Sequence, residues 1–227
     1  MERKEIICSA YRMTGGNNFY DGMITCSTLS GKAVCRLVWA MNKAECDAYL
    51  EKALSGVPDD FSGKLLEVPV GTGILTMPVY QTLPEADITC LDYSADMMGQ
   101  AQEKADRLHL KNVTFRQGDV GALPYADGVF DIVLSLNGFH AFPDKEAAYR
   151  EVFRVLKPGG IFCGCFYVKG EQKRTDWFVR HVYEGTRFFT PPYETAFSLK
   201  KRLEKRYATV TLGTVKSMAW FACRKAE

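Results

Sequence analysis

The sequence predicts an α/β fold: a doubly wound (Rossmann-like), mostly parallel sheet of seven strands, with an antiparallel C-terminal hairpin and a helical N-terminal cap. From residue 63 onward, short apolar runs of strand length alternate with helical patterns, which is typical of a parallel sheet with helices on both faces. A glycine-rich turn follows the first of these runs. The chain has 227 residues, 47% of them apolar, so it is long enough for one well-filled core.

Five strands and two long helices are expected in the core. The strands are expected at 64–70, 86–93, 112–118, 130–137 and 159–168. The first long helix is expected at 94–108 with Ser94 as its N-cap, and the second at 144–156, stopped by Pro158 and Gly159.

The two ends of the chain depart from this alternation. The first 60 residues predict helical and irregular structure, with an amphipathic helix at 43–54. Residues 207–225 contain two strand-like runs separated only by Leu-Gly-Thr at 212–214. That spacing suits a hairpin, so one of the two runs should be antiparallel to the rest of the sheet.

Charge and composition exclude some classes of partner. The net charge is +2, and the basic residues gathered at 169–174 and 200–206 are interleaved with acidic ones, so we expect no binding of nucleic acid. No apolar run reaches the ~18 residues of a membrane span, and the first residues lack the apolar core of a signal peptide. We therefore expect a cytoplasmic protein with no membrane span.

The eight cysteines show no metal-binding spacing, because no C-x-x-C pair occurs among them. Cys163 and Cys165 share one face of an expected strand, where they are interpreted as small buried apolar residues. We expect no metal site.

The turn after the first strand predicts a ligand site. Gly71 and Gly73 let the backbone approach a ligand and leave amide groups pointing at it, at the positive end of the following helix. Asp92 lies nineteen residues beyond Gly73, at the end of the second strand, where a carboxylate can accept hydrogen bonds from ribose hydroxyls. A dinucleotide and S-adenosylmethionine both suit such a site, although the dinucleotide fingerprint requires glycine where Thr76 stands.

Four segments, in the right order, resemble class I S-adenosylmethionine-dependent methyltransferases, particularly the ubiquinone/menaquinone-type (methyltransferase type 11) branch. They are LLEVPVGTG at 65–73, CLDYSADMM at 90–98, GDVGALPYADGVFDIVLSLNGFHAFPD at 118–144 and EVFRVLKPGGIF at 151–162. The resemblance covers roughly residues 60–165 and is looser in the flanks. It implies one methyltransferase domain over 1–227, comprising a cap (1–60), a cofactor-binding core (61–168), a lid insertion (169–205) and the hairpin (206–227).

The resemblance also implies roles for residues that bind the cofactor. Asp92 matches the acceptor for the ribose hydroxyls, and Glu67 matches the acidic residue that organises the methionine amino end. Other matching residues are Tyr93 and Met97 beside the adenine ring, Asp119 as acceptor for its amino group with the Val120 amide next to it, and Tyr20 with Asp21 in the cap over the cofactor. Pro69 departs from the family, since it stands at the position of the first glycine and has no N–H to donate.

Asn137 and His140 follow the fourth strand and should face the methyl donor or the acceptor. His140 is the candidate general base or substrate orienter; the alternative is a histidine packed between Phe139 and Phe142.

Aromatic residues crowd the segment 176–193, which fits a small apolar or aromatic acceptor and equally fits packing under a lid. The first alternative is a nucleic-acid or protein methyltransferase, which the near-neutral charge and the absence of an N-P-P-Y-like motif after the fourth strand disfavour. The second alternative is a non-catalytic protein that binds S-adenosylmethionine or a dinucleotide. We expect a small-molecule acceptor as the partner, and a monomer or homodimer.

Overall fold

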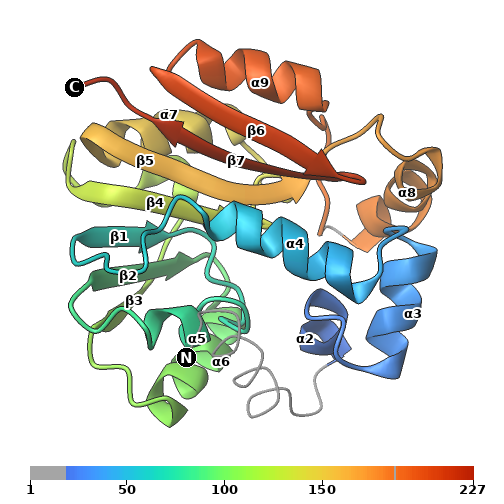
Figure 1. The fold of residues 1–227 in the computed structure, drawn as a ribbon, viewed down its shortest axis with the longest axis horizontal. Coiled ribbons are helices and arrows are strands. Elements are labelled where there is room, and N and C mark those ends of the chain that lie inside the picture. Colours follow the sequence, from blue (N-terminus) through green and yellow to red (C-terminus); the bar gives the residue numbers. More distant parts are fainter. Residues whose placement is uncertain (1–18, 187) are drawn as a thin grey trace.

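The sheet has seven strands in the order β3-β2-β1-β4-β5-β7-β6, as seen in a computed structural model that describes residues 19–186 and 188–227 (Figure 1). The strands are β1 Lys64–Glu67, β2 Asp87–Asp92, β3 Val113–Gln117, β4 Phe130–Leu136, β5 Leu156–Tyr167, β6 Thr209–Val215 and β7 Met218–Arg224. The first five run parallel, and β7 is antiparallel to both of its neighbours, β5 and β6. The predicted fold class is confirmed.

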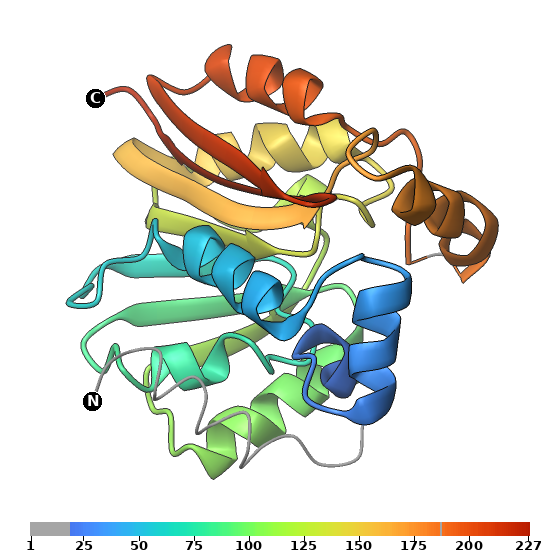
Figure 2. The same cartoon turned by 45° about the vertical axis from the view of Figure 1, so that its right-hand side comes forward.

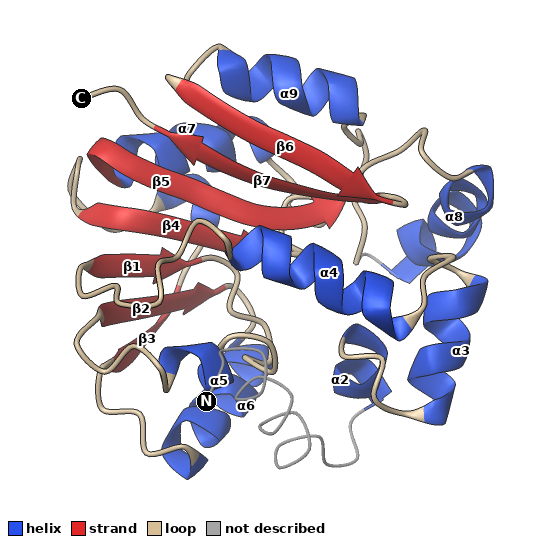
Figure 3. Ribbon diagram, in the orientation of Figure 1, coloured by secondary structure: helices blue, strands red, loops and turns tan. Residues whose placement is uncertain are grey.

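Helices cover both faces of this sheet (Figure 3). The α-helices of the described residues are α2 Phe19–Ile24, α3 Leu29–Leu37, α4 Lys43–Leu54, α5 Met77–Tyr80, α6 Ala95–Arg107, α7 Lys145–Val155, α8 Lys173–Phe178 and α9 Ala196–Glu204. Buried side chains of α4, α5 and α6 form one core with one face of the sheet, whereas those of α7 and α9 form a second core with the other face. The strands supply both cores because successive side chains point to opposite faces, as Leu65 and Leu66 of β1 do.

Local sequence signals explain the helix ends that the sequence predicts well. The expected helix at 43–54 is confirmed as α4, which begins with a capping box between Asn42 and Glu45. Ser94 caps α6 by accepting a hydrogen bond from the Met97 amide. Both cysteines expected to be packing residues, Cys163 and Cys165, are fully buried in β5.

The hairpin prediction placed the turn wrongly. The segment 212–214 lies inside β6, and the chain turns instead at Lys216 and Ser217, between β6 and β7. Gly213 is part of the strand because it faces Trp220 of β7: a Cβ there would lie 2.6 Å from the indole ring. The glycine makes room for an aromatic side chain and does not break the strand.

Two other boundaries differ from the prediction. β1 ends at Glu67, three residues early, and the helix after the glycine turn, α5, is a single turn. β5 begins at Leu156, directly after α7, so Pro158 and Gly159 lie within the strand, next to an irregularity in its pairing with β4.

The position of the site follows from the strand order. The order reverses between β1 and β4, and ligands of doubly wound sheets bind beyond the carboxyl ends of the strands at such a point. The helices α2, α3 and α8 lie beyond these ends (Figures 1 and 2). They therefore cover the edge at which a ligand site is expected.

Candidate functional site

A cavity of about 620 Å³ lies at this edge, between the cap and the ends of β1 to β4. Its size is within the usual range for small-molecule sites. Nine residues singled out from the sequence line it: Pro69, Gly71, Asp92, Tyr93, Met97, Asp119, Val120, Asn137 and His140. The fold thus brings most of the predicted site residues to one hollow.

The glycine turn presents backbone to this cavity. Gly71 has a φ of 55°, and a Cβ added there would meet nothing within 4 Å, so this glycine faces open space. Gly73 has a φ of 67°, but a Cβ there would lie 2.9 Å from the Met77 side chain and 3.0 Å from Ala101. Gly71 therefore leaves room at the cavity, whereas Gly73 allows the turn to pack against α6.

The amide groups of the turn are not aimed at a ligand as expected. The Gly71 amide donates to Asp92 Oδ2 at 2.8 Å, and the Gly73 amide donates to the Val70 carbonyl at 3.0 Å. α5 is too short to present the positive end of a helix to the cavity. Pro69 follows a cis peptide bond and packs against Gly138, which has no Cβ to block it.

Asp92 is held in place by two backbone amides. In addition to the bond from Gly71, its Oδ1 accepts from the Ser94 amide at 2.8 Å. Burial raises the pKa of the Asp92 carboxyl, while these hydrogen bonds act in the opposite direction. Each carboxylate oxygen has a second lone pair, so Asp92 can accept further hydrogen bonds from the cavity side.

The residues predicted to lie beside adenine follow β2 and β3. Tyr93 is exposed at the cavity wall, and Val120 is buried. Asp119 Oδ1 accepts from the Gly121 amide at 2.7 Å, which fixes the carboxylate at the start of the 3-10 turn Val120–Ala122. The arrangement is an apolar slot with a carboxylate at its edge.

Glu67 lies beside the large cavity, in the wall of a smaller hollow of about 60 Å³. Pro69, Gly71 and Asn137 line both spaces. The Glu67 carboxyl is 1% exposed and accepts a hydrogen bond from the Tyr80 hydroxyl at 2.8 Å. Burial raises the pKa of Glu67 to about 8, so the carboxyl holds a proton at neutral pH unless a cation joins it.

His140 is buried in the cavity wall. Its Nδ1 accepts a hydrogen bond from the Tyr167 amide at 3.3 Å, and its ring stacks on Phe189 with a centroid distance of 4.2 Å. Burial lowers the pKa of His140 to about 3, where the sequence alone suggests the usual value near 6.5. The imidazole is therefore neutral and carries its proton on Nε2, which makes it a hydrogen-bond donor.

Aromatic rings extend this wall toward the cap. Phe189 stacks with Trp39 at 6.0 Å between centroids, and Trp39 stacks with Tyr183 at 6.1 Å. All three rings line the cavity, and they come from the cap and from the segment after β5. The aromatic segment 176–193 thus contributes Tyr183 and Phe189 to the cavity, whereas Trp177 of the same segment is exposed and does not line it.

A buried ion pair joins the cap to α6, and its carboxylate also accepts a hydrogen bond from the glycine turn. Asp21 of α2 accepts a hydrogen bond from the Thr72 hydroxyl at 2.6 Å and lies 3.1 Å from Lys104 of α6. Both charged side chains are about 5% exposed or less. Tyr20 lies in α2 beside Asp21, but its side chain is outside the described part of the structure.

Sequence reasoning missed Lys104, although a signal was present. Lys104 lies on the helical face that Ala101, Ala105 and Leu108 share, and this face turns toward the core. A lysine on an apolar helical face requires a buried partner, and Asp21 is that partner.

Known proteins resemble this chain in sequence and in fold. A family model described as a methyltransferase domain matches residues 60–206, more than half of the chain. The demethylmenaquinone methyltransferase of Thermus thermophilus is 38% identical over 97 residues, which are 43% of this chain and 44% of that protein. The chloroplastic 2-methyl-6-phytyl-1,4-hydroquinone methyltransferase 2 of Oryza sativa is 35% identical over 107 residues, 46% of this chain and 30% of that protein.

Solved structures share the fold. The S-adenosylmethionine-dependent methyltransferase of Aquifex aeolicus aligns with a TM-score of 0.60 and 16% identity, covering 92% of this chain and all of that one. The matches to the curated relatives span less than half of their length. Among the described residues, no helix has both the length and the apolar composition needed to cross a membrane.

Proposed function

Because this chain belongs to the methyltransferase domain family, we propose that it transfers a methyl group from S-adenosylmethionine to a small, apolar or aromatic acceptor. The observation that carries the proposal is one cavity in which cofactor-type carboxylates and an aromatic wall meet. The quinone-type names of the relatives favour a hydroquinone or other phenol as the acceptor.

The residues present fit S-adenosylmethionine. Asp92 would hold the ribose hydroxyls, Asp119 the adenine amino group, and the open face of Gly71 the methionine part. Glu67 would face the methionine amino group across the smaller hollow, where a cation would stabilise the charged form of the carboxylate. When bound, this cofactor supplies a methyl group already activated by a positively charged sulfur.

The chain contributes alignment and exclusion of water. Trp39, Tyr183 and Phe189 give a planar acceptor an apolar surface that keeps water away from it. The Nε2–H of His140 can donate to an acceptor oxygen and fix its orientation. We therefore assign His140 an orienting role, because its low pKa makes it a weak proton acceptor.

The test is a methyl-transfer screen with isotopically labelled S-adenosylmethionine over quinol, phenol, amine and lipid acceptors. We expect label in a quinol or phenol product. Calorimetry should show binding of S-adenosylmethionine and none of NAD. Transfer to RNA or protein, or binding of NAD alone, would contradict the proposal.

Asp92→Ala tests whether Asp92 contributes to cofactor binding. Loss of a hydrogen-bonded carboxylate should weaken cofactor binding by about tenfold or more, which corresponds to roughly 1.5 to 3 kcal/mol. Calorimetry measures the affinity, and circular dichroism confirms that the variant is folded. Wild-type affinity in the folded variant would remove Asp92 from the ribose site.

A further inference from the structure

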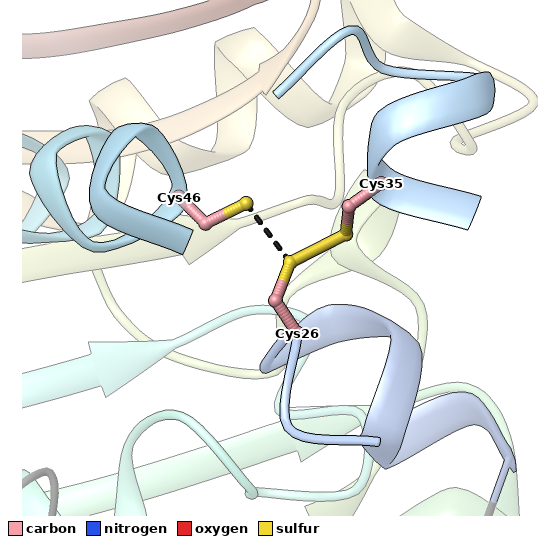
Figure 4. Close-up of side chains that lie close together, drawn as sticks. All are labelled: Cys26, Cys35 and Cys46. Atoms are coloured by element: carbon pink, nitrogen blue, oxygen red, sulfur yellow. Dashed lines mark hydrogen bonds between the residues drawn. A yellow bond between two sulfur atoms is a disulfide. The ribbon is translucent and has the colours of Figure 1, made fainter. Parts of the chain in front are cut away.

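Three cysteines of the cap point toward one another, although the sequence separates them by nine and eleven positions (Figure 4). Cys26 follows α2, Cys35 lies on α3 and Cys46 lies on α4. Their relative exposures are 1%, 4% and 2%, and their sulfur atoms all lie within 4.8 Å of one another. Cys26 and Cys35 form a disulfide, and Cys46 Sγ is 3.0 Å from Cys26 Sγ.

The disulfide accounts for two of these side chains and leaves the position of Cys46 unexplained. Three sulfurs from three separate segments at one point match the geometry of a metal site, since thiolates about 2.3 Å from a tetrahedral ion are about 3.8 Å apart. The three sulfurs lie within 4.8 Å of one another, so a spacing of this size requires only a small change after reduction of the disulfide. Thiolate sulfur selects thiophilic ions such as Zn²⁺ over Mg²⁺ or Ca²⁺.

We propose that reduced Cys26, Cys35 and Cys46 bind one thiophilic divalent ion through three thiolates. A dithiol or phosphine reductant first supplies two electrons to the disulfide, which takes up two protons and becomes two thiols. Binding of the ion then releases three protons, one from each thiol, and leaves a complex with a net charge of −1.

Cys46 is the fourth residue of α4, in the first turn, where the positive end of the helix dipole lies.

The proposed ion would border the substrate cavity. Cys35 and Cys46 are among the residues that line it, and an ion with three protein ligands keeps a fourth position open. The inference does not depend on the proposed methyl transfer, because metal content is measured without any substrate.

The experiment titrates Cd²⁺ into reduced, metal-free protein under anaerobic conditions after removal of the reductant. The sulfur-to-metal charge-transfer absorbance reports thiolate ligation, and equilibrium dialysis with elemental analysis counts the ions. We expect about one ion per chain, and none after oxidation with diamide. Fewer than about a tenth of an ion on the reduced protein would overturn the proposal.

Cys46→Ala separates the metal site from a plain disulfide, because it leaves Cys26 and Cys35 intact. We expect its Cd²⁺ affinity to fall by about tenfold or more. Cys223→Ala, which removes a buried thiol of β7, is the control and should bind as the wild type does. If Cys46→Ala is poorly folded, Cys46→Ser replaces it, and wild-type affinity in the folded variant would overturn the proposal.

Discussion

Burial decides what His140 can do in the cavity. Its Nδ1 is occupied by the Tyr167 amide, and its pKa of about 3 keeps the ring neutral throughout the usual range of enzyme assays. A neutral imidazole of this tautomer can only donate through Nε2. The occupied Nδ1 and the low pKa both support the proposed orienting role over proton removal.

The variants His140→Ala and His140→Asn test this role. Alanine leaves the buried Tyr167 amide without a partner and should cost about 1 to 3 kcal/mol of stability. Asparagine can place its Oδ1 near the position of Nδ1 and should restore most of that loss. We expect the pH–rate profiles of the wild type and of His140→Asn to have the same ionisations. An ionisation near 6.5 that is present in the wild type and absent from His140→Asn would make His140 a base.

Glu67 links the stability of the cofactor-free protein to pH. Its pKa is about 8 in the folded protein and near 4.5 in the unfolded chain, so the folded state holds the proton more tightly. The stability that this provides is complete below about pH 4.5 and is lost as pH rises toward 8. The slope cannot exceed about 1.4 kcal/mol per pH unit for one group.

Glu67→Gln should remove this dependence. Glutamine keeps an oxygen that can accept from the Tyr80 hydroxyl but has no charged form. Urea unfolding at about pH 5, 6.5 and 8 should show the variant gaining stability relative to the wild type as pH rises. Parallel curves for the two proteins would show that Glu67 does not titrate in this range.

At the scale of single elements, the two glycines of the turn are expected to affect different properties, one cofactor binding and the other stability. Gly71 and Gly73 both have positive φ, so alanine at either position costs about 1 to 2 kcal/mol in the backbone. Gly73→Ala also forces contacts with Met77 and Ala101, whereas Gly71→Ala projects its methyl group into open space. Gly73→Ala should therefore be the less stable variant, and Gly71→Ala the one with the weaker cofactor binding.

Thermal unfolding and calorimetry with S-adenosylmethionine measure the two effects. The opposite ranking, with Gly71→Ala less stable and Gly73→Ala weaker in binding, would mean that the motif is aligned in the wrong register.

Elements with strong local signals could be predicted from the sequence, and those fixed by distant contacts could not. α4 begins and ends as predicted because Asn42 and Glu45 cap it locally. The turn of the hairpin was misplaced because the role of Gly213 depends on Trp220, on the other strand. Sequence spacing likewise gives no hint that Cys26, Cys35 and Cys46 meet, since their contact depends on how three helices pack.

At the scale of the whole molecule, the alternation of strands and helices was enough to predict the sheet and the edge that holds the cavity. How the cap sits on the core was not predictable. That placement involves a buried ion pair: the apolar helical face indicates that Lys104 needs a buried partner, but the sequence does not show that this partner is Asp21 of the cap.

The pair of Asp21 and Lys104 should couple the stability of the molecule to cofactor binding. Asp21 belongs to the cap, Lys104 to α6, and Thr72 to the glycine turn. The Asp21 carboxylate therefore connects the cap to both α6 and the glycine turn. Removing one partner of a buried ion pair leaves an uncompensated charge and costs about 3 to 5 kcal/mol. Asp21→Asn should therefore be strongly destabilised and should bind S-adenosylmethionine more weakly.

A double-mutant cycle shows whether the pair itself is responsible. Lys104→Met removes the buried cation and retains an apolar side chain of similar length, so the double variant Asp21→Asn/Lys104→Met contains no unpaired charge at this position. We expect it to be more stable than Asp21→Asn alone, with a coupling energy of about 1 kcal/mol or more in urea unfolding. Its cofactor affinity should remain below that of the wild type, because the double variant lacks the ion pair that ties α2 to α6. If the loss of stability in the double variant equalled the sum of the losses in the two single variants, the ion pair would contribute nothing and the cap would be held by its apolar contacts.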